Sequence, residues 1–249
     1  DFLANISHDL KTPLTSIQGF AGALVDGTCP PDTYPAVARI IHGEAERMGQ
    51  LVGDILMLSR LEAGELPLSL APVDLAELLR AGERRFAAAA QGAGVTIRVE
   101  VPPAGTLSLL GDRGRLEQVL GNLIENALRH TPAGGRIDLV AGAIEAEGRP
   151  CARLLVRDTG AGIAPADLPR IFERFYQADK ARVAGRGGAG LGLAIVKELI
   201  ERHGGTVQAE STLGAGTTIA IRLPLAQRAG GQPGTESPPV GASGTRRGA

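Results

Sequence analysis

The sequence has no tryptophan, few aromatic residues of any kind and no excess of charge of either sign. Aromatic side chains make up 3% of the 249 residues, and 26 Lys and Arg residues against 27 Asp and Glu residues leave a net charge of -1. This balance provides no clustered positive charge for binding a nucleic acid or an anionic membrane surface. We therefore expect no nucleic-acid partner.

Cysteine and long apolar runs are also scarce. Cys29 and Cys151 stand alone, without the spacing of a metal site or a redox motif, so we expect both thiols to be reduced and structural. No run approaches the roughly 18 apolar residues that a membrane-spanning helix needs, and no basic and then apolar leader opens the chain. Because residues 1–3 have the pattern of a helix interior, we expect the chain to begin within a longer protein.

The first part of the chain has the pattern of a helical hairpin. Apolar residues recur at steps of three and four over residues 2–25 and again over 37–63, with a turn rich in Gly and Pro between them. Pro13 is expected to kink the first helix. Two amphipathic helices cannot bury both apolar faces as a pair, so we predict that residues 1–64 of two chains join into a four-helix bundle in a homodimer. The alternative is that the hairpin packs on the rest of its own chain.

Strands and helices alternate in the remainder of the chain. Residues 65–73 contain two prolines and are predicted to be an extended linker. In residues 74–225 the mixture of elements predicts an α+β fold, with a sheet covered by helices on one face. Residues 226–249 are rich in Gly, Pro, Ser and Thr and are predicted to be a disordered tail. The expected helices are 74–90, 112–130 and 191–203, and the expected strands are 95–101, 107–110, 136–143, 152–158, 206–211 and 217–223.

One face of the predicted helix 112–130 carries polar residues at successive turns. Asn122 and Asn126 are stacked with Arg129 and His130, and apolar residues occupy the opposite side. Amide oxygens suit Mg²⁺, which keeps several waters and uses substrate phosphates as ligands, and Arg129 offers charge to phosphate. A solvated helix face is the alternative, but it would explain charged residues better than two amides one turn apart.

Two glycine-rich segments follow this helix. Asp158, Gly160 and Gly162 form a D-x-G-x-G pattern after a predicted strand, where a carboxylate can accept a hydrogen bond from an amino group such as that of adenine. Residues 187–192 run glycines into a helix, whose N-terminal amides favour phosphate. Alone, neither pattern is specific: the first occurs in ordinary turns, and the second lacks the Lys of a P-loop and the preceding strand of a dinucleotide fingerprint.

Together and in this order, the segments resemble the core of a sensor histidine kinase. Residues 7–13, Ser-His-Asp-Leu-Lys-Thr-Pro, are similar to the phospho-acceptor H box. The resemblance extends over about residues 1–225, and it implies a HisKA-type dimerisation hairpin followed by an α/β sandwich of the Bergerat (GHKL) type that binds ATP. It also implies the cytoplasmic portion of a protein that is anchored in a membrane through upstream segments. The segments similar to the N, G1, F and G2 boxes are 122–126, 158–162, 172–176 and 188–192.

The resemblance implies a reaction at His8. His8 would take the γ-phosphoryl group of ATP on a ring nitrogen, with Asp9 as the general base that holds the ring tautomer. The phosphoryl group would then pass to an aspartate in the receiver domain of a response regulator. Thr12 stands where the family uses Thr or Asn to orient water against the partner's phospho-aspartate, which implies a phosphatase activity as well.

The resemblance also implies a site for ATP and Mg²⁺. Asn126 would be the metal ligand, Asp158 would bind the adenine amino group, and residues 177–189 would form a mobile lid. His130 stands where many relatives have Tyr. The residues implied to bind the nucleotide are Asn122, Asn126, Arg129, His130, Asp158, Gly160, Gly162, Lys180, Gly188, Gly190, Leu191, Gly192 and Thr217.

Two other interpretations remain open. A GHKL ATPase that hydrolyses ATP to drive a clamp has a Glu four residues before the Mg²⁺ ligand, but here Asn122 holds that place, and Glu125 lies about 100° round the helix from Asn126. A catalytically dead scaffold would dimerise and relay signals, but every motif residue is chemically competent. Phosphorylation of His8 by its own chain and by the dimer mate are both open as well.

Overall fold

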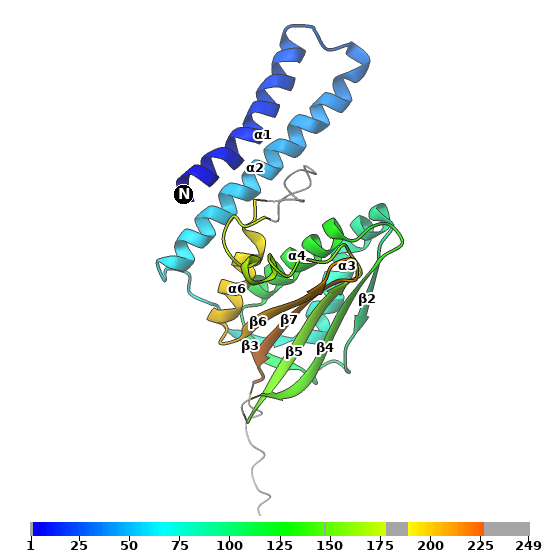
Figure 1. Cartoon of the computed structure of the whole chain (residues 1–249). Coiled ribbons are helices and arrows are strands. Elements are labelled where there is room, and N and C mark those ends of the chain that lie inside the picture. The colour runs from blue at the N-terminus through cyan, green and yellow to red at the C-terminus, as the bar shows by residue number, and fades with distance from the viewer. Residues whose placement is uncertain (1, 147, 178–188, 227–249) are drawn as a thin grey trace, which may run out of the picture.

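The computed structural model describes residues 2–146, 148–177 and 189–226, with side chains from residue 6 onward. A long helical hairpin precedes a mixed α/β domain, as Figure 1 shows. The predicted succession of a helical hairpin and an α/β sandwich is thus confirmed. Of the predicted tail, all but Ala226 lies outside the described residues. No helix in the described part of the chain is long and apolar enough to cross a membrane.

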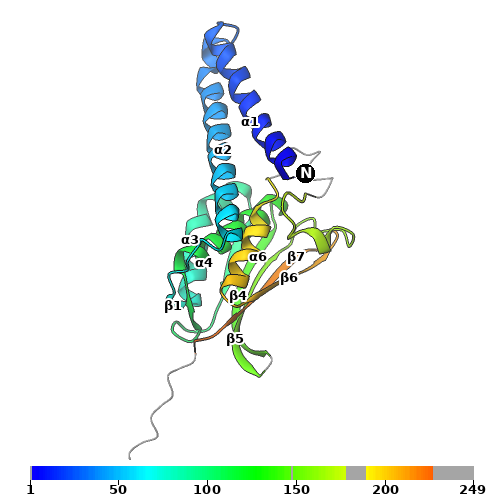
Figure 2. The same ribbon diagram turned by 90° about the vertical axis from the view of Figure 1, so that its left-hand side faces the viewer.

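The hairpin consists of α1 (Phe2–Val25) and α2 (Tyr34–Glu62), which lie side by side in both views of the chain (Figures 1 and 2). Helix α1 continues through Pro13, which is buried. The backbone N–H of Cys29 donates to the carbonyl of Ala23 at 3.1 Å. A short 3₁₀ turn, Pro31–Thr33, then leads into α2. The loop therefore reverses the chain within a few residues, as its Gly and Pro content predicts.

The α/β domain is built from a five-stranded sheet with helices on one face (Figure 2). The strand order is β2-β4-β5-β7-β6, in which only β2 and β4 are parallel. Asp74 and Asp112 cap α3 and α4, because their carboxylates accept the backbone N–H groups of Ala76 and Arg115. The elements are β1 (Ala71–Asp74), α3 (Leu75–Ala93), β2 (Thr96–Glu100), β3 (Ser108–Gly111), α4 (Arg113–His130), β4 (Arg136–Ala146), β5 (Arg149–Asp158), a 3₁₀ turn (Leu168–Arg170), α6 (Gly192–Arg202), β6 (Thr206–Thr212) and β7 (Gly216–Pro224).

A second, two-stranded sheet joins β1 and β3 at the start of the domain. Pro72 lies opposite Leu110, and Val73 lies opposite Leu109, in an antiparallel register. The end of the segment predicted to be a linker is therefore an extended strand. The side chain of Val73, in this strand, is buried in the core of the α/β domain.

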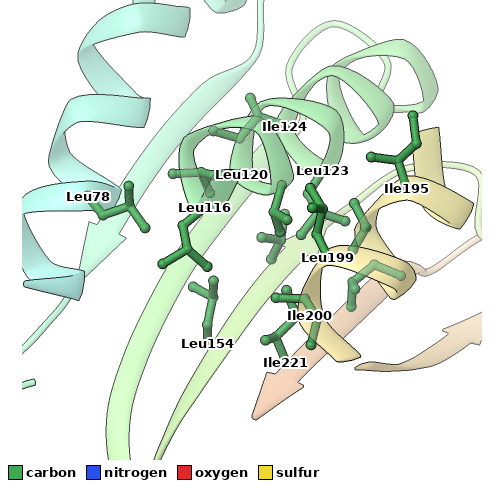
Figure 3. Close-up of a cluster of buried hydrophobic side chains, with 14 of the residues drawn as sticks. Leu78, Leu116, Leu120, Leu123, Ile124, Leu154, Ile195, Leu199, Ile200 and Ile221 are labelled. Atoms are coloured by element: carbon green, nitrogen blue, oxygen red, sulfur yellow. The ribbon is translucent and has the colours of Figure 1, made fainter. Parts of the chain in front are cut away.

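The core of the domain lies between the helices and the large sheet. Figure 3 shows Leu116, Leu120 and Leu123 of α4 facing side chains of α6 and of the sheet. Each of the ten labelled side chains is at most 3% exposed. Burial of a side chain of this size contributes about 1.5–3 kcal/mol, so the cluster fixes α4 and α6 on the sheet. The labelled residues are Leu78, Leu116, Leu120, Leu123, Ile124, Leu154, Ile195, Leu199, Ile200 and Ile221.

The hairpin packs on the α/β domain through the C-terminal part of α2. Met57, Leu58 and Leu61 are buried and belong to the same hydrophobic cluster as the core of the domain. This matches the alternative in which the hairpin packs on its own chain, but only for part of its surface. Seven large apolar side chains of α1 and α2 remain exposed: Leu14, Phe20, Val25, Tyr34, Ile40, Val52 and Leu56.

Candidate functional site

The side chain of His8 is 82% exposed on α1. Its Nδ1 atom lies 3.2 Å from Oδ1 of Asp9, and because a carboxylate only accepts hydrogen bonds, Nδ1 carries the proton. The other ring nitrogen, Nε2, then carries the lone pair and is the nucleophilic atom. The hydroxyl of Thr12 donates to the carbonyl of His8 at 3.3 Å, one turn along the helix.

On α4, Asn122 links the polar stripe to the start of α6. Its Nδ2 atom donates to the carbonyl of Gly192 at 3.2 Å. Asn126 is half-buried one turn further on, and Arg129 and His130 are exposed in the last turn. The predicted alternative of a plain solvated face does not describe Asn122, because its amide is engaged with a second element.

Asp158 is the buried acid at the end of β5. It is 8% exposed, and its Oδ1 atom accepts the N–H groups of Gly160 at 2.8 Å and Thr217 at 3.2 Å. Burial raises the pKa of this carboxyl, and the two backbone hydrogen bonds oppose that shift. Both of these hydrogen bonds use Oδ1.

Two glycines allow this loop to approach other backbone segments closely. A Cβ atom on Gly160 would lie 2.4 Å from the carbonyl oxygen of His130, and one on Gly162 would lie 2.1 Å from that of Thr212. Gly162 also has a φ of +69°, which side chains rarely adopt. The two glycines therefore allow the loop to lie between the end of α4 and the end of β6. This role is separate from any close approach of a ligand.

His130 lies next to this loop. Its carbonyl accepts the N–H of Ala161 at 3.2 Å. Restricted hydration lowers the pKa of the imidazole, the charge of Arg129 lowers it further, and Asp158 opposes the shift. The net shift favours the neutral form of the His130 ring.

The glycine segment before α6 is held by the residues 172–176. Gly190, with a φ of +69°, accepts the N–H of Phe175 at 3.0 Å. Leu191 is buried and precedes the first residue of α6, Gly192. Lys180 and Gly188, which the sequence also implied as nucleotide contacts, lie outside the described residues, as does most of the predicted lid.

The structure also shows a polar residue at the site that the sequence pattern did not indicate. The hydroxyl of Ser211 accepts the N–H of Ile163 at 2.8 Å and donates to the carbonyl of Gly216 at 2.8 Å. It also lies 2.9 Å from the hydroxyl of Thr217. Ser211 thus joins the two loops around Asp158, but a serine near the end of a strand is too common to signal this role.

The described site therefore consists of three parts: two pairs of residues, each joined by a hydrogen bond, and the separate His8. Asp158 and Thr217 meet at one end, and Asn122 and Gly192 meet along α4. The described contacts of the His8 side chain lie within α1 and include none of these four residues. The described residues contain no group of three or more His, Cys, Asp or Glu side chains that could hold a metal ion.

Comparisons with known families agree with both parts of the chain. The family model for the His Kinase A (phospho-acceptor) domain matches residues 1–64. The model for the Histidine kinase-, DNA gyrase B-, and HSP90-like ATPase matches residues 111–227.

Among curated proteins, the sensor protein SrrB of Staphylococcus aureus (strain NCTC 8325 / PS 47) is 38% identical over 225 residues, which are 90% of this chain and 38% of that protein. The present chain thus spans well under half the length of this relative.

Solved structures of histidine kinases are similar as well. The Acinetobacter baumannii histidine kinase AdeS superposes with a TM-score of 0.70 at 26% identity, covering 88% of this chain and 98% of that one. Full-length ShkA in complex with AMPPNP gives a TM-score of 0.68 at 35% identity, covering 92% of this chain and 46% of that one. The mycobacterial sensor histidine kinase MprB gives 0.53 at 30% identity, covering 63% of this chain and 97% of that one. The resemblance predicted from the H, N, G1, F and G2 segments is confirmed, and the chain belongs to the sensor histidine kinases.

Proposed function

We propose that this chain catalyses ATP-dependent autophosphorylation of His8 and transfers the phosphoryl group to an aspartate of a response regulator. The observation that carries the proposal is the exposed His8 ring, whose Nδ1–H is held by Asp9. This contact directs the lone pair of Nε2 to solvent, where it can attack the γ-phosphorus while the bond to ADP breaks. Asp9 stabilises the positive charge that develops on the ring, and the phosphorylated ring then donates its phosphoryl group to a carboxylate.

The nucleotide is proposed to bind along α4, between Asp158 and the start of α6. Oδ2 of Asp158 accepts the adenine amino group, and the neutral His130 ring lies beside the base. Asn122, Arg129 and the backbone of Gly190, Leu191 and Gly192 line the phosphates. Residues 160, 162 and 217 shape the base pocket, and we extend the phosphate contacts to Lys180 and Gly188.

The magnesium ion in this proposal is held by Asn126. A half-buried amide oxygen fits Mg²⁺, which needs only one or two protein ligands beside water and substrate phosphates. When bound, the ion neutralises charge on the transferred phosphoryl group.

Two partners are proposed. A second copy of the chain would cover the exposed apolar side chains of the hairpin, among them Phe20, Ile40 and Leu56, and complete a four-helix bundle. The second partner is the receiver domain of a response regulator. Thr12, one turn from His8, would orient water in a phosphatase reaction. Residues 1–64, 65–73 and 74–225 are our proposed hairpin, linker and ATP-binding domain, and any membrane anchor would lie upstream.

The proposal is tested by incubating the chain with γ-labelled ATP and Mg²⁺. We expect label on the protein that survives alkali and is lost in acid, as expected for a phosphohistidine, and no label on the His8→Gln variant. His42→Gln is a matched control, because His42 is also exposed on the hairpin. Steady phosphate release without labelling would instead support the ATPase interpretation, and absence of both would support the scaffold.

A further inference from the structure

Ser211 of β6 uses the full hydrogen-bonding capacity of its hydroxyl group. The hydroxyl donates to the carbonyl of Gly216 at 2.8 Å and accepts the backbone N–H of Ile163 at 2.8 Å. It also lies 2.9 Å from the hydroxyl oxygen of Thr217, its partner in the register of β6 and β7. A hydroxyl has one proton to donate and two lone pairs that accept. All three are therefore engaged around Ser211.

These contacts determine the direction of the proton between Ser211 and Thr217. Because a carbonyl oxygen only accepts, the one proton of the Ser211 hydroxyl belongs to its contact with Gly216. The proton in the contact between the two hydroxyls must then come from Thr217. The Thr217 hydroxyl is thereby a donor to Ser211, and toward any other group it can only accept.

Thr217 lies directly beside the acid of the proposed base pocket. It is 8% exposed, and its backbone N–H donates to Oδ1 of Asp158 at 3.2 Å. The carboxylate of Asp158, when ionised, likewise only accepts hydrogen bonds. The two side chains thus present acceptors and no donor. This pattern fits an amino group, which has two protons to donate, and repels a carbonyl oxygen at the same place.

The turn between β6 and β7 holds this arrangement against the loop that follows β5. Gly214 in the turn donates its N–H to the carbonyl of Ala161 in the loop at 2.7 Å. A Cβ atom on Gly216 would lie 2.0 Å from the carbonyl oxygen of Asp158, so the start of β7 and the end of β5 are in close backbone contact. Ser211 therefore connects segments whose backbones already meet, which leaves its hydroxyl little freedom to turn.

We propose that Ser211 is a positioning residue for selection of the base. By accepting the proton of Thr217, it keeps the Thr217 hydroxyl as an acceptor beside Asp158, and the pocket then prefers a purine with an amino group to one with an oxo group at the same position. This inference rests on the proposed binding of adenine at Asp158 and adds the group that sets the discrimination. A buried acceptor that meets a carbonyl oxygen stays unpaired, which makes the wrong base costly to bind.

Binding of ADP and of inosine diphosphate (IDP) tests this role. IDP has an oxo group and a ring N–H where ADP has the amino group and an unprotonated ring nitrogen, and neither nucleotide has a γ-phosphate to transfer. In Ser211→Ala the proton of Thr217 is free to turn and to meet the oxo group as a donor. We expect the ratio of the dissociation constants, IDP to ADP, to fall by about three- to tenfold in calorimetric titrations, the range for one hydrogen bond.

Two other variants should keep the ratio of the original chain. Ser211→Thr retains a hydroxyl at this position of the strand. Ser108→Ala removes a serine hydroxyl opposite Asp74, in the sheet of β1 and β3. If Ser211 only held the loop in place, Ser211→Ala would weaken the binding of ADP and IDP by the same factor, and that result would overturn the proposal.

A double-mutant cycle shows whether Ser211 acts through Thr217. Thr217→Val removes the hydroxyl but keeps the branched shape and the N–H that binds Asp158, so it should lower the ratio of IDP to ADP by itself. Adding Ser211→Ala to Thr217→Val should change the ratio no further, because the proton that Ser211 orients is then absent. An unchanged ratio in Thr217→Val would contradict the proposal even if Ser211→Ala did not fold.

These titrations are separate from the test of the kinase function. A chain that binds ADP in preference to IDP but acquires no label at His8 would contradict the proposed autophosphorylation and leave this inference standing. A chain that binds ADP no more tightly than IDP would show that the pocket does not select the amino group, and the inference would then be wrong whether or not His8 is labelled.

Discussion

At the scale of single residues, Gly162 shows how closely the site is packed by its own backbone. Its φ of +69° and the 2.1 Å approach that a Cβ atom would make to Thr212 leave no room for a side chain. We expect Gly162→Ala to lower the free energy of unfolding by about 2–4 kcal/mol, because left-handed backbone strain and steric overlap both contribute. Urea denaturation measures this difference.

Gly142→Ala is the matched control for this substitution. Gly142 lies on β4, and a Cβ atom there would meet nothing within 4 Å. We expect its effect to stay below about 1 kcal/mol. Equal stability of Gly162→Ala and the original chain would show that the loop moves away from Thr212 without cost.

The sequence predicts the glycines of this loop but not the strained residue that contacts Gly190. Phe175 has a φ of +59°, and it is the one non-glycine residue with positive φ in the described part of the chain. An aromatic residue disfavours that conformation by about 1–2 kcal/mol. Burial of the ring and the hydrogen bond to Gly190 offset the strain, and the partner in this hydrogen bond lies 15 positions away. No local pattern could indicate such a contact.

At the scale of elements, helices with a capping acid are predictable from the sequence. Asp74 and Asp112 precede apolar residues at helical spacing, and their carboxylates accept backbone N–H groups where α3 and α4 begin. The sheet of β1 and β3 is not predictable in the same way. Pro72 favours an extended segment, but only the pairing with Leu110 distinguishes a strand from a linker.

His203 connects two of these elements. Its Nδ1–H donates to the carbonyl of Leu199 at 2.7 Å, so Nε2 is the acceptor for the N–H of Asp112 at 3.0 Å. This buried ring thus joins the end of α6 to the cap of α4. We expect His203→Leu to lower the free energy of unfolding by about 1–3 kcal/mol, because the N–H of Asp112 would lose its partner.

Chemical denaturation of three chains tests this role. His42→Leu is the control, because His42 is exposed on α2 and pairs only weakly with Glu46 at 3.6 Å. Its effect should be within about 0.5 kcal/mol. The interpretation of His203 as a link would be wrong if both variants shifted the denaturation midpoint equally.

At the scale of the whole molecule, the position of the domain against α2 is beyond what periodicity indicates. Spacing shows that α2 has an apolar face, but the contacts that cover its end come from Arg174 and Arg202, more than 100 residues further along the chain. Periodicity also cannot show which residues of one apolar face contact the domain and which residues remain exposed. In the structure, Leu58 and Leu61 face the domain, while Val52 and Leu56 stay exposed.

An open cleft lies between α2 and α4, with Asp54 on one side and Glu125 on the other. It makes the packing of the α/β domain against α2, here called docking, depend on pH. Burial, followed by repulsion from Glu125, raises the pKa of Asp54 from 3.8 to about 6. The other charged residues that line the cleft are Arg85, Arg115 and Glu117. When the domain moves away, Asp54 regains water and its ordinary pKa, so the docked form binds the proton more tightly.

Docking should therefore strengthen as the pH falls through about 6 and should lose this contribution above it. Between pH 7 and pH 5 we expect the ratio of docked to detached molecules to rise by about tenfold. Electron-spin distance measurements between spin labels on Cys29 in the hairpin turn and Cys151 on β5, with labelled chain diluted into unlabelled chain, give that ratio. Because histidines also titrate in this range, the informative quantity is the difference between the original chain and Asp54→Asn, which should lack this rise. Asp32→Asn, in the exposed hairpin turn, should keep it. If Asp54→Asn followed the same pH profile as the original chain, another group would have to be the one that controls docking.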